Sequence, residues 1–239
     1  MFPVRDNVPR RSLPLVTWGL ILANAAVFYL ELGWSSDGKL ASMLDEFGIV
    51  PKRALSKSEG VLAFEPSAWW PFLTSMFLHG GFMHLIGNMW SLWIFGDNVE
   101  DRMGSARFLA FYIFCGVIAG FTHSLTNPTS VVPAIGASGA IAGAFGAYFL
   151  LFPRARITFV FPILIYPVFF EIPAFFYLLW WFVTQVTSGT TALGVADPSG
   201  GVAWWAHIGG FIAGALLFPF FLKPKKRSGG WPERRPGMF

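Results

Sequence analysis

The chain has 239 residues, of which 54% are hydrophobic and only 13% are charged, and its formal net charge is +4. A soluble domain normally carries about a quarter charged residues, so the composition excludes an ordinary soluble protein and predicts a membrane protein. The positive charge does not indicate a nucleic acid as partner, because no basic stripe alternates with aromatic residues. The single cysteine, Cys115, cannot form an internal disulfide and is expected to be a small packing residue.

Apolar runs of about the length that a helix needs to cross the hydrocarbon layer recur along the chain. Six such runs lie at residues 14–32, 80–97, 106–125, 136–152, 167–187 and 202–222. The sequence therefore predicts an all-α, polytopic membrane protein with six transmembrane helices in one bundle. In this prediction the bundle covers residues 14–222, after an amino-terminal tail at 1–13 and before a basic, disordered tail at 223–239.

The first apolar run could instead be a cleaved export signal, since Arg5, Arg10 and Arg11 precede it. With about 19 residues, it is longer than the apolar region of most signal peptides, and no small-x-small cleavage site ends it. It is therefore predicted to remain as the first membrane helix.

The distribution of basic residues predicts the orientation. Lys and Arg residues gather in both tails and in the second and fourth connections, whereas the third and fifth connections, about 126–135 and 188–201, contain none. Only the long first connection breaks this pattern, because its basic residues are offset by acidic ones. Cytoplasmic segments carry the excess of Lys and Arg, so both termini are predicted to be cytoplasmic. The expected location is the bacterial inner membrane, with the lipid bilayer as a constant partner.

Four polar residues fall at similar depths in three of the predicted helices. With this orientation, His84, Ser138 and His207 lie within about 10 Å of the outer surface at a rise of about 1.5 Å per residue. Asn88 is one turn below His84 on the same helix face. Serine alone is common at ordinary helix contacts. The agreement in depth, together with the cost of burying unpaired polar groups in a membrane, indicates a functional site.

Pairs of glycines beside these residues predict close helix packing. Gly139 and Gly143 form a small-xxx-small face on the fourth predicted helix, and Gly210 and Gly214 form one on the sixth. Such faces let helix backbones approach closely. A short serine side chain needs this proximity to reach within about 3 Å of an imidazole nitrogen.

These residue types suit acyl transfer. Serine is a weak nucleophile that needs a base, so Ser138 is the predicted nucleophile and His207 the predicted general base and acid. The tetrahedral intermediate needs hydrogen-bond donors for its oxyanion, which His84, the Asn88 side chain and the backbone N–H of Ser138 could supply. No Asp or Glu lies at this depth to orient His207, so a dyad is expected rather than a triad.

The segments that carry these residues resemble motifs of the rhomboid family of intramembrane serine proteases, in the family's order. Residues 79–89 resemble its H-x-x-x-x-H-x-x-x-N segment, residues 136–139 its G-x-S-G motif and residues 206–210 its A-H-x-x-G segment. Residues 96–101 are similar to the acidic turn that the family places after its second helix. The resemblance extends over nearly all of 14–222.

The resemblance implies metal-independent cleavage of transmembrane protein substrates near the outer membrane face, with a preference for small residues at the cut. It implies the same roles for Ser138, His207, His84 and Asn88, and no cofactor or metal. The alternative is a non-catalytic rhomboid-like protein that binds and hands over membrane helices. The presence of both Ser138 and His207 argues against it, because binding alone requires neither.

Three features depart from the pattern or stay open. Some family members have an aromatic residue four positions after the nucleophile, where this chain has Ala142, so the support for His207 is expected to come from elsewhere. His79 is expected at the outer boundary without an assigned role. Residues 157–170 are apolar but contain Pro162 and Pro167, and are expected to form an interfacial or kinked start of helix five, with Glu171 near the cytoplasmic headgroups.

Overall fold

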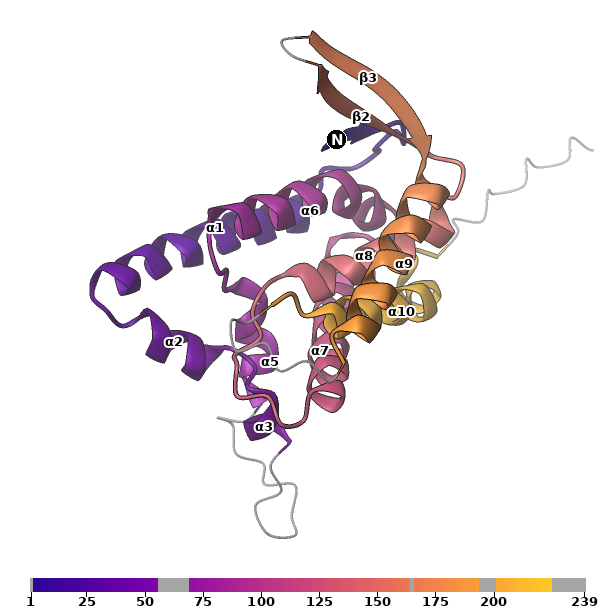
Figure 1. Ribbon diagram of the computed structural model, residues 1–239. Helices are drawn as coiled ribbons and strands as arrows, with labels where there is room; N and C mark the ends of the chain where they lie inside the picture. The colour runs from indigo at the N-terminus through magenta and orange to yellow at the C-terminus, as the bar shows by residue number, and fades with distance from the viewer. Residues whose placement is uncertain (1, 56–68, 164–165, 194–200, 225–239) are drawn as a thin grey trace, which may run out of the picture.

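A computed structural model describes residues 2–55, 69–163, 166–193 and 201–224 (Figure 1). It is mostly helical. Six helices overlap the six predicted runs: α1 (Leu15–Ser36), α6 (Phe82–Met103), α7 (Ser105–Thr126), α8 (Ser138–Leu151), α9 (Ala174–Thr191) and α10 (Trp204–Phe221). Shorter elements are α2 (Leu40–Phe47), α3 (Pro51–Ala54), α5 (Pro71–Thr74), η1 (Ser75–Phe77) and the strands β1 (Phe2–Asp6), β2 (Arg156–Ile163) and β3 (Tyr166–Pro173).

Within the described residues, three helices are long and apolar enough to cross a membrane, namely α1, α7 and α10. Helix α8 is also apolar but has only 14 residues. The predicted helices therefore exist, while the number of membrane crossings stays a prediction. Of the tail predicted at 223–239, residues 225–239 lie outside the described part of the chain.

The prediction of an all-α fold is wrong for two segments. Residues expected to form a kinked start of helix five instead form the antiparallel hairpin β2–β3, in which Pro162 and Pro167 face each other. Large apolar residues at alternate positions explain strand β2. Ile157 and Phe159 lie on the same face of the strand and are almost fully buried, and β-branched and aromatic residues fit a pleated, half-buried surface. The predicted amino-terminal tail adds strand β1 to the free side of β2.

The prediction of an acidic turn at residues 96–101 is also wrong. These residues form the last turns of α6, which continues to Met103. Gly104 ends the helix with φ of +84°, a backbone conformation that glycine adopts far more readily than other residues. The carboxylate of Glu100 then accepts hydrogen bonds from Thr17 N (2.8 Å) and Thr17 Oγ1 (2.8 Å), which fixes the start of α1 against the end of α6.

Helix α8 lies at the centre of the bundle and contacts α6, α7, α9 and α10 (Figure 1). All residues from Gly139 to Tyr148 are buried. The predicted close approach of α8 and α10 is present. A Cβ added to Gly210 would lie 2.0 Å from the carbonyl oxygen of Gly139, and one added to Gly214 would lie 1.9 Å from that of Gly143.

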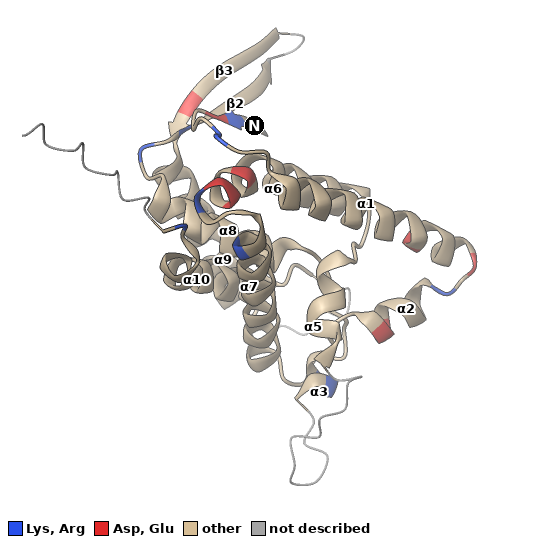
Figure 2. Cartoon of the chain, turned by 180° about the vertical axis from the view of Figure 1, so that it is seen from behind, with Lys and Arg blue, Asp and Glu red and all other residues tan. Residues whose placement is uncertain are grey.

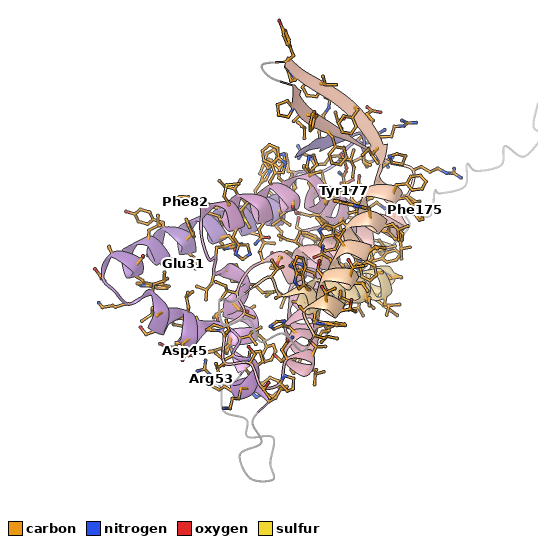
Figure 3. All side chains as sticks on the ribbon, viewed as in Figure 1. Glu31, Asp45, Arg53, Phe82, Phe175 and Tyr177 are labelled. Carbon is orange, nitrogen blue, oxygen red and sulfur yellow. The ribbon has the colours of Figure 1, made fainter. Side chains whose placement is uncertain are left out.

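Charged residues gather at the two ends of the structure and leave the helices between them largely uncharged (Figure 2). One charged end carries the sheet and the end of α6, and the other carries α2 and α3. At the second end, Asp45 of α2 and Arg53 of α3 lie together and form an ion pair of 2.9 Å (Figure 3). This distribution is the one expected for a bundle embedded in lipid between two polar interfaces.

Candidate active site

The structure brings Ser138 and His207 into contact. Ser138 is the first residue of α8, and His207 lies in the first turn of α10. The hydroxyl Oγ of Ser138 is 2.8 Å from Nε2 of His207. The His207 side chain is buried. The two residues are 69 positions apart in the chain, and the glycine contacts between α8 and α10 bring them together.

The other nitrogen of the imidazole has a partner that sequence analysis missed. Nδ1 of His207 is 2.7 Å from Oε1 of Gln185 in α9. Gln185 is buried, and its amide nitrogen donates to Trp181 O (3.1 Å) and Thr184 Oγ1 (3.0 Å). The same depth criterion that selected Ser138 would have selected Gln185, because it lies in the outer half of an apolar run.

Aromatic rings complete the surroundings of His207. The centroid of Trp181 lies 5.8 Å from that of the imidazole, and Trp204 meets the imidazole edge-on at 6.3 Å. Ala142, where some family members have an aromatic residue, is fully buried. The support that Ala142 cannot supply therefore comes from α9 and from the start of α10.

His84 and Asn88 flank the turn that leads into α8. Nδ1 of His84 accepts a hydrogen bond from Gly80 N (3.3 Å), so Nε2 carries the proton in the neutral ring. A Cβ added to Gly136 would lie 2.8 Å from His84 Nε2 and 3.6 Å from Asn88 Nδ2. Both side chains therefore present N–H donors beside Gly136, two residues before Ser138.

His79, expected at the outer boundary, is buried and holds Asn88 in place. The Asn88 amide nitrogen lies 3.0 Å from His79 Nε2. The backbone N–H of His79 donates to the carboxylate of Glu31, at 3.0 and 3.2 Å to its two oxygens. Glu31 is a buried residue of α1 that sequence analysis did not select (Figure 3). The segment before α6 is thereby tied to α1.

A small cavity adjoins the candidate nucleophile. It has a volume of about 30 Å³, and Ser75, His123, Gly136, Ser138 and Ala206 are among the residues that line it. This is enough room for a water molecule, and the wall includes polar groups. His123 is a further residue near the site that sequence analysis missed. A larger hollow, of about 500 Å³, lies against the sheet beside Arg5 and Phe169.

Comparison with known proteins identifies the family. The model of the Rhomboid domain matches residues 66–224, which is more than half of the chain. The chain is 41% identical to the putative rhomboid protease YdcA of Bacillus subtilis over 83 residues, which are 35% of this chain and 41% of that protein. It is 34% identical to the mitochondrial Rhomboid protein 1 of Saccharomyces cerevisiae over 148 residues, which cover 59% and 39% of the two chains.

A longer match is with the mitochondrial presenilin-associated rhomboid-like protein of Homo sapiens, at 27% identity over 206 residues, or 82% of this chain and 45% of that protein. The chain spans less than half the length of each of these three relatives. With its apolar helices it is an integral membrane protein. Because the Rhomboid domain model matches more than half of its residues, this chain belongs to the rhomboid family.

Proposed function

We propose that this chain is an intramembrane serine endopeptidase that cleaves transmembrane protein substrates near the outer membrane face. The single observation that supports this most directly is the 2.8 Å separation of Ser138 Oγ and His207 Nε2. At this separation the imidazole can take the hydroxyl proton as the oxygen attacks a carbonyl carbon.

The proposed reaction follows from this pair. Ser138 Oγ attacks the scissile carbonyl, and its proton passes to His207 Nε2. The imidazolium then donates that proton to the leaving amine, which leaves an acyl-enzyme for a water molecule to hydrolyse. His84 Nε2–H, the Asn88 amide and the unpaired N–H groups at the start of α8 are the proposed donors to the oxyanion.

The proposed topology has six membrane crossings with both termini in the cytoplasm, and residues 14–222 form the protease domain. The substrate is proposed to be a membrane protein whose helix unwinds readily near its outer end, since a helical peptide bond is shielded from attack. The bacterial inner membrane stays the proposed location, although the relatives include mitochondrial as well as bacterial proteins.

A cleavage assay tests the proposal. The full chain is purified in detergent and incubated with a labelled transmembrane substrate. We expect cleavage by the wild type, and a loss of at least about 1,000-fold with either Ser138→Ala or His207→Ala, because each removes an essential member of the pair. Thermal unfolding of each variant provides the folding control.

The rival function, binding and handover of membrane helices without catalysis, predicts a different outcome. In that case the wild type, Ser138→Ala and His207→Ala would all retain the substrate helix uncut, and the three would bind it equally. Cleavage that persists in both variants would also reject the proposed pair.

A further inference from the structure

The imidazole of His207 is held through both of its nitrogens, and the second contact is with a neutral amide. We propose that Gln185 is the positioning residue of the pair, so that Ser138, His207 and Gln185 form a Ser–His–Gln chain within the bundle. This inference rests on the proposed function of Ser138 and His207. It assigns Gln185 the task of setting the tautomer and orientation of the base.

Hydrogen bonds fix which end of the Gln185 amide faces the imidazole. The amide nitrogen donates to the carbonyl oxygen of Trp181 (3.1 Å), which can only accept. That nitrogen also lies 3.0 Å from Thr184 Oγ1. The amide oxygen is therefore the atom directed to His207, and it can only accept a hydrogen bond.

An acceptor on one side of the ring determines the chemistry on the other side. Because Gln185 Oε1 accepts at 2.7 Å, Nδ1 of His207 must carry the proton of the neutral imidazole. The lone pair then lies on Nε2, which is 2.8 Å from Ser138 Oγ. This is the tautomer that can take the serine proton, whereas the opposite tautomer would present an N–H to the hydroxyl.

The position of Gln185 on α9 makes this arrangement rigid. Trp181 lies one helical turn earlier on the same face, so one turn of α9 provides both the amide acceptor and the ring that faces His207. Gln185 and His207 are both buried, at 5% and 9% exposure. Few other orientations of either side chain can satisfy their buried polar atoms.

A neutral amide suits this depth better than a carboxylate would. An ionised side chain inside a membrane helix is costly, and a carboxylate paired with a neutral imidazole would stay uncompensated until the proton transfer. The amide orients the ring without adding charge. The expected consequence is a weaker stabilisation of the imidazolium than a carboxylate would give.

Three variants of the full chain test the assignment, in the cleavage assay and after a melting control. Gln185→Leu keeps a similar side-chain volume but removes the hydrogen-bond acceptor. We expect kcat to fall about tenfold to hundredfold, because the buried Nδ1–H of His207 loses its partner, while KM changes by less than about twofold. Gln185→Glu keeps an acceptor, so it retains more activity than Gln185→Leu. Its carboxylate stabilises the imidazolium and moves the acidic limb of the pH–rate profile to higher pH.

Thr187→Val is the matched control on the same helix. The Thr187 hydroxyl bonds only to backbone oxygens of α9 and is exposed, so its removal should leave kcat and the pH profile unchanged. A wild-type kcat and pH profile in Gln185→Leu would overturn the assignment of Gln185.

A readout independent of proteolysis separates this inference from the proposed function. Nitrogen-15 NMR of the protein in bilayers, with labelled histidines, reports the tautomer of each imidazole directly. The signals of His207 are identified as those that are absent from the spectrum of His207→Ala. We expect an Nδ1–H tautomer in the wild type and a shift toward Nε2–H in Gln185→Leu. An Nε2–H tautomer in the wild type would overturn the inference. An Nδ1–H tautomer in a protein that cleaves nothing would support it while rejecting the proposed function.

Discussion

At the scale of single residues, the turn before Ser138 depends on one glycine. Gly136 has φ of +122°, a conformation that side chains with a Cβ rarely adopt. It also lies against the ring of His84, where an added Cβ would be 2.8 Å from two ring atoms. The glycine thus allows the proposed oxyanion donors to approach the start of α8.

Substitution of this glycine should damage the site more than the fold. We expect Gly136→Ala to lower the rate of substrate cleavage at least tenfold and the free energy of unfolding by about 1–3 kcal/mol, because of backbone strain and the displaced imidazole. Gly80→Ala is the control, since a Cβ there meets nothing closer than 3.9 Å. Equal activity in the two variants would contradict this account of the turn.

The residues of the site were predictable to different degrees. Ser138 and His207 follow from the depth of polar residues in apolar runs, and the glycine faces predict that their helices touch. Gln185 satisfies the same depth criterion but was missed, because the partner that orients a catalytic histidine is usually expected to be Asp or Glu. The role of His79 was also missed, since its contacts with Glu31 and Asn88 depend on how α1 meets the segment before α6.

At the scale of elements, the sheet shows what an apolar run alone cannot decide. Run length predicts a membrane helix for residues 167–187, but only the part from Ala174 is helical. Large apolar residues occupy alternate positions of β2, at Ile157, Phe159 and Phe161, yet short apolar segments are ambiguous between strand and helix. The pairing of β1 with β2 was not predictable, because it joins segments about 150 residues apart in the chain.

Strand β1 is attached to the bundle by a partly buried carboxylate, that of Asp6. Asp6 accepts hydrogen bonds from the Tyr148 hydroxyl and from Asn98 Nδ2, the latter at 2.7 Å. Burial raises the pKa of Asp6 above its ordinary value of 3.8, against the lowering effect of the Tyr148 hydrogen bond. Asp97, whose carboxylate interacts electrostatically with that of Asp6, forms an ion pair of 3.5 Å with Arg10.

The raised pKa of Asp6 predicts a pH dependence of stability. The folded state binds the Asp6 proton more tightly than the unfolded state does. The stability that Asp6 contributes is therefore complete below its unfolded pKa of 3.8 and is lost as the pH rises through its folded pKa. Between pH 4 and 7, thermal unfolding in detergent should show a decline in wild-type stability that is smaller in Asp6→Asn. The exposed Asp37→Asn variant should retain the wild-type decline. The same slope in all three proteins would refute the prediction.

At the scale of the whole molecule, the short central helix α8 would place the proposed nucleophile, Ser138, below the membrane surface. The 14 residues of α8 span about 21 Å at 1.5 Å per residue, whereas the hydrocarbon layer is about 30 Å thick. If the cytoplasmic end of α8 is level with its neighbours, Ser138 lies roughly 10 Å below the outer surface. The longer helices around it then exclude lipid from the site.

The proposed function depends on the pairing of α8 with α10, which brings Ser138 into contact with His207. Chemical labelling of Ser138 tests whether His207 activates it. The purified protein is treated with a fluorophosphonate, which reacts with activated serines, and the modified residue is identified by mass spectrometry. We predict a single adduct on Ser138 that is absent after His207→Ala, although that variant melts as the wild type does. An adduct on another serine, or labelling of Ser138 that does not depend on His207, would contradict the account.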